Sequence, residues 1–119
     1  MQLALSNSFQ ALRDAAGVSI RYVRGSDSIA IVAVPGRTDY ETETFGGVYN
    51  SDQSRDYLVL AEDLKFSGNT VLPERGDEIR ETIGGQETVF PVLDLGGGRH
   101  YSFSDQYRIV VRIHTKQSQ

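Results

Sequence analysis

Cysteine is missing from this sequence of 119 residues, and that absence removes several kinds of chemistry. Without thiols there is no disulfide framework, no thiolate nucleophile and no zinc site with sulfur ligands. Long apolar runs are missing as well, since none approaches the ~18–20 residues that a membrane-spanning helix needs. The first residues, MQLALSNSFQALRD, lack the basic flank and apolar centre of a signal peptide. We therefore expect one soluble domain over residues 1–119, stabilised by packing and kept inside the cell.

Patterns that indicate catalysis are also scarce. There is no GxSxG elbow to hold a serine nucleophile. The three glycines at 96–98 are followed by RHYSFSD rather than a helix, so they indicate a flexible connector and not a phosphate loop. His100 and His114 lack paired ligand spacing and are expected at the surface. Five carboxylates near predicted turns are expected to form a solvated rim rather than an acid–base pair or cation site: Glu74, Asp77, Glu78, Glu81 and Glu87. The sequence therefore predicts no enzyme, no metal site and no cofactor.

The formal net charge of −4 is unevenly distributed. Residues 1–38 and residues 88–119 each hold four basic and two acidic groups, whereas residues 39–87 hold twelve acidic and four basic groups. A surface that binds phosphates needs a stripe of Lys and Arg that neutralises charge and releases counterions. The acidic middle of the chain would instead repel DNA, which excludes a nucleic-acid-binding footprint there.

Hydrophobic spacing predicts one short helix over residues 5–15. Leu5, Phe9, Leu12 and Ala16 follow spacings of four, three and four, which place them on one helical face. Gly17 follows as a suitable C-cap. Beyond Gly17 the period changes to two, which is typical of half-buried strands.

Strands are predicted at residues 18–22, 29–35, 55–61, 78–83, 87–93 and 106–116. Gly84-Gly85 indicates a tight hairpin between the fourth and fifth of these segments. In the last segment one face carries Tyr107, Ile109, Val111 and Ile113, and the other carries Arg108, Val110, Arg112 and His114. The pattern predicts an all-β fold, a small barrel or sandwich of six to eight strands, with one short N-terminal helix and a long loop.

Residues 36–54, GRTDYETETFGGVYNSDQS, are predicted to form that long loop. The Thr/Tyr/Glu part is compatible with an extended strand, but Gly46-Gly47 and the small polar residues favour an irregular segment. Loops of this length in compact domains are usually functional or disordered. The aromatic residues Tyr40, Phe45 and Tyr49 beside carboxylates suit contact with a partner, although packing onto the loop's own domain is an equally weighted alternative.

The order of these segments resembles the small head–tail connector proteins of tailed bacteriophages, in the head-closure or stopper group. The resemblance covers about residues 17–116, through GVSIRYVRG, IAIVAVPGRT, RDYLVLAEDL, LPERGDEI, GGQETVFPV and YRIVVRIHTK. Its most specific element is P-x-x-G-D-x-I at 73–79, followed by the GGQ hairpin and a basic closing strand. The N-terminal helix lies outside the resemblance.

The resemblance implies a structural virion protein of the phage neck, built as a β-barrel subunit of a homo-oligomeric ring, twelve-fold or six-fold. Such a ring closes the DNA-filled head below the portal or adaptor protein, and the tail terminator or tail tube docks on it. Genomic DNA passes through the ring without sequence-specific binding, and no membrane is involved. Assembly in the host cytoplasm would precede its place in the virion.

In relatives of this kind a long loop between early strands projects into the central channel and plugs it. The matching segment here is 36–54. The residues implied to line or plug the channel are Asp39, Tyr40, Glu41, Glu43, Phe45, Tyr49 and Asp52. An anionic wall does not bind phosphates, so DNA held behind it is able to slide through later.

A ring also requires two different complementary faces on each subunit. We expect basic residues of the first and last strands, Arg21, Arg24, Arg108, Arg112 and Lys116, to meet acidic groups of a neighbour, among them Glu74, Asp77, Glu78 and Glu81. The alternative is that these charges only keep the domain soluble. Three other functions stay open: a tail-terminator or tail-tube ring protein, a small enzyme or ligand-binding barrel, and a monomeric interaction module.

Overall fold

The computed structural model describes residues 2–43, 49–93, 99–103 and 108–116. Within them the chain forms one α-helix, one short 3-10 helix and nine strands. The elements are α1 (Gln2–Ala16), β1 (Val18–Arg24), β2 (Asp27–Glu43), β3 (Tyr49–Leu60), η1 (Ala61–Asp63), β4 (Lys65–Phe66), β5 (Asn69–Thr70), β6 (Glu78–Ile83), β7 (Gln86–Pro91), β8 (Tyr101–Phe103) and β9 (Val110–Thr115).

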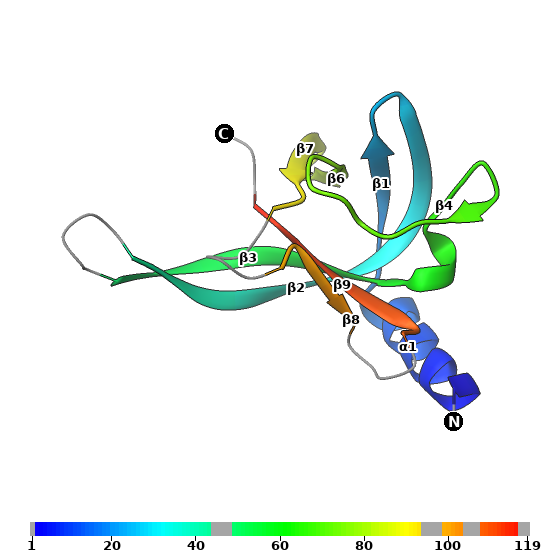
Figure 1. Cartoon of the computed structure of the whole chain (residues 1–119). Coiled ribbons are helices and arrows are strands. Elements are labelled where there is room, and N and C mark those ends of the chain that lie inside the picture. The colour runs from blue at the N-terminus through cyan, green and yellow to red at the C-terminus, as the bar shows by residue number, and fades with distance from the viewer. Residues whose placement is uncertain (1, 44–48, 94–98, 104–107, 117–119) are drawn as a thin grey trace.

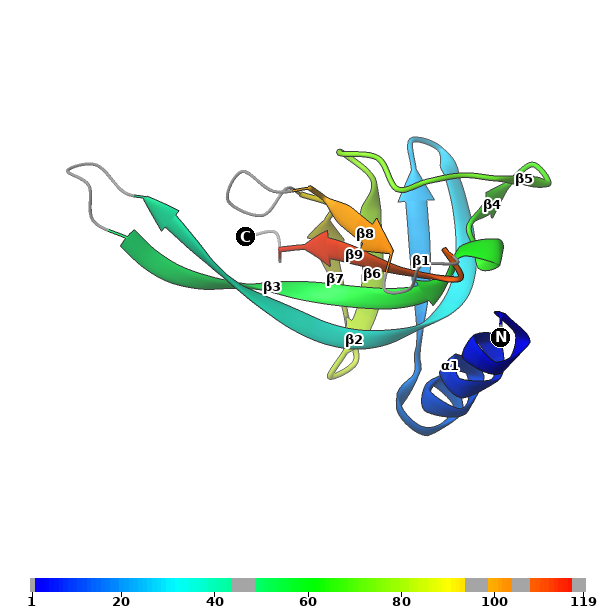
Figure 2. The ribbon, with the colours of Figure 1, turned by 60° about the horizontal axis from the view of Figure 1, so that its bottom comes forward.

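Seven of the strands form one antiparallel sheet in the order β7-β6-β1-β2-β3-β9-β8, and β4 pairs with β5 separately. Strand β2 belongs to both halves of this sheet. Up to Ala33 it pairs with β1, and from Val34 onward it pairs with β3. The sheet curves along β2, so that its two halves face each other as in a sandwich (Figures 1 and 2). The all-β prediction is confirmed, although the sheet is not closed into the barrel that the resemblance implied.

The main core lies between the two halves of the sheet. Its fully buried members come from both halves, for example Tyr22 and Ile79 from one and Tyr57 and Ile113 from the other. A second, smaller cluster lies on the outer face of the sheet, where Phe9 of α1 packs on Val34, Leu60 and Val110. Because side chains alternate along a strand, β3 presents Tyr57 and Val59 to the main core and Leu58 and Leu60 to the outer face.

The predicted helix is confirmed and is longer than expected, because α1 begins at Gln2. Its predicted apolar face holds at Phe9 but not at Leu12, which is 45% exposed; the side chain of Leu5 lies outside the described residues. Gly17 ends the helix, and its N–H donates to the Arg13 carbonyl at 2.7 Å. The C-cap prediction is therefore confirmed.

The predicted strands at 18–22, 29–35, 55–61 and 78–83 are confirmed, and so is the hairpin at Gly84-Gly85. Both glycines have positive φ, 60° and 81°, as a two-residue hairpin turn requires. The last strand is shorter than predicted and begins at Val110. Arg108 has a φ of 58°, which interrupts an extended strand, and residues 106 and 107 lie outside the described part.

Within residues 36–54, the extended strand that the sequence allowed for the Thr/Tyr/Glu part is confirmed, whereas the prediction of an irregular loop is wrong for residues 49–54. Strand β2 continues to Glu43 and β3 starts at Tyr49, and the two pair in continuous register from Val34–Leu58 to Glu43–Tyr49. Strand β9 joins β3 only from Arg55 onward, and β1 leaves β2 at Ala33. Residues 38–43 and 49–54 therefore form a two-stranded ribbon, which has no third strand among the described residues. We call this segment the ribbon; it projects from one end of the molecule, opposite α1 (Figures 1 and 2).

Candidate functional site

The ribbon carries the acidic positions that the family resemblance implies for a channel lining. Backbone alternation and register place positions 39, 41 and 43 on one face of the ribbon, together with 49, 51 and 53. Position 52 pairs with Tyr40 and lies on the other face. No Lys or Arg occurs between residues 38 and 54. The structure thus gathers Asp39, Tyr40, Glu41, Glu43, Tyr49 and Asp52 in one projecting element; Phe45 lies outside the described residues.

At the root of the ribbon, the inner face of β3 holds a charged cluster formed by Arg55, Tyr57 and Glu81. Arg55 Nη2 donates to Glu81 Oε1 at 2.7 Å, and the Tyr57 hydroxyl donates to the same oxygen at 2.7 Å. The Arg55 guanidinium also lies over the rings of Tyr57 and Phe90, at 5.3 and 5.2 Å from their centroids. Burial, and then the hydrogen bond to Glu81, raise the pKa of Tyr57 above its ordinary value. This cluster ties β3 to β6 across the core.

The outer face of β3 holds a second charged cluster at the same root, centred on Asp56. This carboxylate is fully buried and accepts hydrogen bonds from Arg112 Nη1 at 2.6 Å and from the Ser54 hydroxyl. Arg112 binds Oδ2, whereas Ser54 donates to Oδ1, and His114 Nδ1 also lies 2.9 Å from Oδ1. Because Asp56 and His114 are direct partners in the β3–β9 register, their side chains meet on one face. This cluster ties β3 to β9.

The expectation of a surface position for His114 is wrong, since only 7% of this residue is exposed. The alternation of the last strand was assigned correctly, but its second face is covered rather than solvated. Val110 on that face packs under α1, and His114 packs against Asp56. A strand with both faces covered cannot be recognised from its polar residues alone.

The GD pair of the PERGD turn forms a third cluster, away from the ribbon. Asp77 accepts hydrogen bonds from the Tyr22 hydroxyl at 2.5 Å, from Arg24 Nη2 at 2.9 Å and from the Glu74 backbone N–H at 2.9 Å. Gly76, with a φ of 93°, supplies the turn that brings Asp77 inward. Burial raises the pKa of Tyr22, and the hydrogen bond to Asp77 raises it further. The motif therefore fixes the turn to β1.

These contacts correct the solvated-rim prediction for two of its five carboxylates. Asp77 and Glu81 are buried, at 3% and 6% exposure, because each meets a tyrosine and an arginine. Glu74 and Glu87 are exposed and Glu78 is half-buried, as a rim requires. Burial of Asp77 depends on partners 53 and 55 positions away in sequence, and no local pattern reveals them.

The proposed ring-contact residues fall into two groups. Arg24, Asp77, Glu81 and Arg112 take part in the clusters within the chain, as described above. The second group lies at or near the surface: Arg21, Glu74, Glu78, Arg108 and Lys116. Arg21 donates to the Ser28 hydroxyl at 2.6 Å and lies opposite Arg80 in the β1–β6 register. Like charges in direct cross-strand positions are unfavourable, and here Glu78 and Glu87 pair with Arg80 at 3.0 and 3.4 Å.

The sequence did not predict that Arg55, Asp56 and Tyr57 form charged clusters at the root of the ribbon. The only signal was that RDY opens a buried strand with two charged residues, while the closing strand is basic. That combination favours a cross-strand ion pair.

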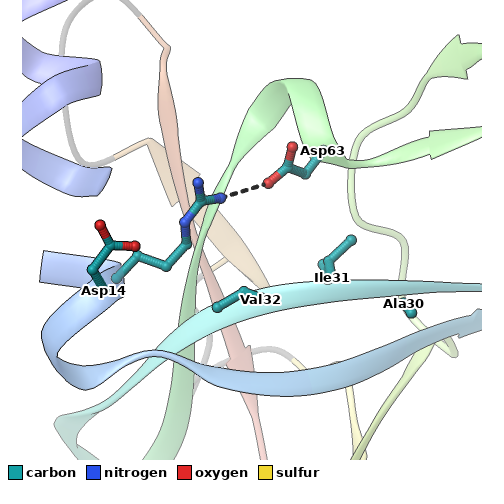
Figure 3. Close-up of a pocket in the computed structure, with 6 residues that line it drawn as sticks. Asp14, Ala30, Ile31, Val32 and Asp63 are labelled. Atoms are coloured by element: carbon teal, nitrogen blue, oxygen red, sulfur yellow. Dashed lines mark hydrogen bonds and ion pairs between the residues drawn. The ribbon is translucent and has the colours of Figure 1, made fainter. Parts of the chain in front are cut away.

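A shallow cavity of about 470 Å³ lies between the last turn of α1, β2 and η1 (Figure 3). Ala30, Ile31 and Val32 form its apolar floor. Arg13 Nη1 donates to Asp63 Oδ2 at 3.1 Å across one side, and Asp14 lies at another. Within the described part of the chain, no group of three or more acidic, His or Cys side chains is placed to hold a metal ion.

The comparison with protein families gives a match over residues 1–119 to the family described as phage head–tail joining protein. The chain belongs to this family. The head–tail joining family supports a structural role in the phage neck, in contact with head and tail components, and it is not a family of enzymes. The resemblance to phage head–tail connector proteins is confirmed, and the match extends over α1 as well.

The comparison with curated proteins gives no match. Among the described residues, no helix has both the length and the apolar character needed to cross a membrane.

Proposed function

We propose that this head–tail joining chain forms a homo-oligomeric ring that closes the DNA-filled head below the portal or adaptor, and that its ribbon lines or plugs the DNA channel. The observation that carries the proposal is the projecting acidic ribbon, which meets no third strand in the described residues. Twelve or six copies surround the passage. The tail terminator or tail tube docks on the opposite side of the ring.

The ribbon suits this role because of its length and its charge. Six steps from Arg37 to Glu43 span about 20 Å at about 3.3 Å per residue, which is far enough to reach an axis that the body of the subunit does not touch. Its carboxylates repel phosphates, so DNA is blocked mechanically without being bound, and it passes through without sequence-specific contacts. This arrangement holds the genome in the virion after assembly in the host cytoplasm.

Contacts between subunits are then made by charged groups at or near the surface of the body. Arg21, Arg108 and Lys116 supply the basic face, and Glu74 and Glu78 supply the acidic face of the next copy. The clusters around Asp77, Glu81 and Asp56 hold each subunit together. Glu74 and Glu78 also pair within the chain, with Arg24 at 3.5 Å and with Arg80 at 3.0 Å, so a neighbour's basic residue would join these surface pairs.

Electron microscopy of the assembled neck tests the proposal, with and without the ribbon. In the shortened variant, residues 39–53 are replaced by Asn-Gly, so that Thr38 and Ser54 are joined by a two-residue hairpin turn. We expect the wild-type ring to carry density from the ribbons toward its axis. We expect rings of the shortened variant to assemble with an open channel and to lose DNA from filled heads. Ribbons that point away from the axis, or heads that retain DNA without them, would contradict the proposal.

A further inference from the structure

The ribbon leaves the body between two buried charged clusters that lie on opposite faces of β3. Arg55 is the residue nearest the ribbon at which β3 still pairs with β9, and it joins Glu81 and Tyr57 on the inner face. Its neighbour Asp56 joins Arg112 and His114 on the outer face. The Thr115 hydroxyl also donates to the Arg55 carbonyl at 2.6 Å. The root is therefore held from both sides at one point along the strand.

Stability alone does not account for charged groups at this position. Burying an ion pair costs desolvation energy that its attraction offsets only in good geometry, and apolar side chains of similar volume often stabilise as well or better. Hydrogen bonds between charged groups restrict the orientation of the strands that they join, because the bonds weaken steeply when donor and acceptor are misaligned. Here the clusters join β3 to β6 on one side and to β9 on the other. A tilt of β3 at Arg55 or Asp56 would misalign both sets of bonds.

From this placement we infer that Asp56 and Glu81, with their partners, are positioning residues that set the direction in which the ribbon leaves the body. This positioning role is a property of the single chain. Its consequence for the virion rests on the proposed function, because an aimed ribbon is what allows several copies to converge on one axis. The span from Arg55 to Asn50 is about 16 Å, so a swing of about 15° at the root moves position 50 by about 4 Å. In a ring, the distance between position 50 of two opposite copies would change by about twice that amount when both ribbons swing.

Distances between pairs of spin labels on the full chain test the inference, and the lack of native cysteine makes the labelling clean. One label is placed in the ribbon at Asn50→Cys. The other is placed in the body at Ser19→Cys or, in a second sample, at Lys65→Cys, both of which are exposed positions. Dilution with unlabelled chain removes distances between copies. Pulsed electron paramagnetic resonance then reports the width of each distance distribution.

In the wild-type background we expect narrow distributions from both body positions. Glu81→Gln and Asp56→Asn each remove one root charge at nearly constant shape. Because position 50 then moves by about 4 Å for a swing of about 15°, at least one distribution should widen about two-fold. Asp77→Asn is the matched control. It removes a buried carboxylate that also meets a tyrosine and an arginine, but that lies away from the root. It should lower the midpoint of thermal unfolding while leaving both distributions narrow.

The inference fails if the wild-type distributions are already as wide as those of the root variants. It also fails if the root variants leave them narrow, or if Asp77→Asn widens them equally. Where a root variant does not fold, Arg112→Lys and Ser54→Ala replace it, since each weakens the Asp56 cluster without removing its charge. Narrow distributions in the isolated chain, combined with off-axis ribbons in the assembled ring, would refute the proposed channel role and leave the positioning role intact.

Discussion

Replacement of Asp77 by alanine should destabilise the subunit strongly. The side chain is 5% exposed and accepts hydrogen bonds from the Tyr22 hydroxyl, the Arg24 guanidinium and the Glu74 backbone N–H. Asp77→Ala leaves all three donors without their acceptor and leaves the arginine charge beside the core. Removing one partner of a buried ion pair typically costs about 3–5 kcal/mol.

The lower end of that range applies to this pair. The Arg24 side chain is 28% exposed and also donates to the Leu72 carbonyl at 2.7 Å, so part of its charge stays solvated and paired. We therefore expect a loss of about 3 kcal/mol in the free energy of unfolding. At about 4 °C per kcal/mol for a chain of this size, the midpoint of thermal unfolding should fall by about 12 °C.

Urea unfolding followed by circular dichroism measures this loss, with Glu87→Gln as the matched control. Glu87 is also a carboxylate paired with an arginine, at 3.4 Å from Arg80, but its side chain is 54% exposed. That variant should stay within about 0.5 kcal/mol of the wild type. A loss of less than about 1 kcal/mol for Asp77→Ala would show that the hydrogen bonds of the PERGD turn do not stabilise the fold.

Three further outcomes follow from other contacts. Gly17→Ala should destabilise the chain, because a Cβ there would come within 2.4 Å of the Arg13 carbonyl oxygen; thermal unfolding checks this, and an unchanged midpoint would show that the helix end shifts freely. Tyr22 and Tyr57 have raised pKa values in the folded state, so the stability they contribute is complete below about pH 10 and is lost as the pH rises further. In a spectrophotometric titration, both should ionise only together with alkaline unfolding, and early, reversible ionisation of every tyrosine would contradict their burial. Ring assembly measured by light scattering should weaken as salt increases, and Arg21→Glu should weaken it further; assembly indifferent to both would refute charge pairing between subunits.

The strands of the main sheet were predictable because their burial follows from local alternation. Ile20 and Tyr22 on β1 alternate with polar neighbours. The glycine pair at 84–85 is a local signal for the hairpin between β6 and β7 and does not depend on distant residues. The sequence allowed an extended strand in the first half of the ribbon but did not decide it, because neither face of residues 38–43 is apolar. Acidic residues alternate with Thr and Tyr there, so the period of two carries no hydrophobic contrast. The extended conformation of residues 38–43 depends on their cross-strand pairing with residues 49–54, which is seen only in the structure.

The buried carboxylates escaped prediction for a different reason. Asp56 meets residues 56 and 58 positions later, and Glu81 meets residues 24 and 26 positions earlier. Isolated acidic residues are normally solvated, and only the folded arrangement of β3, β6 and β9 supplies donors that offset the cost of burial. The family resemblance was nevertheless within reach, because the PERGD turn, the hairpin and the closing strand are local features in a fixed order.

The continuity of β2 has a mechanical consequence. The same strand pairs with β1 near its start, with β3 along the rest of its length, and ends in the ribbon. A force along the ribbon is therefore transmitted by the continuous backbone of β2 into both halves of the sheet. There it acts parallel to the strands, so that the hydrogen bonds between them are loaded together in shear and are not broken one after another. Tension applied to the ribbon would therefore be shared between β1 and β3, the two strands that pair with β2.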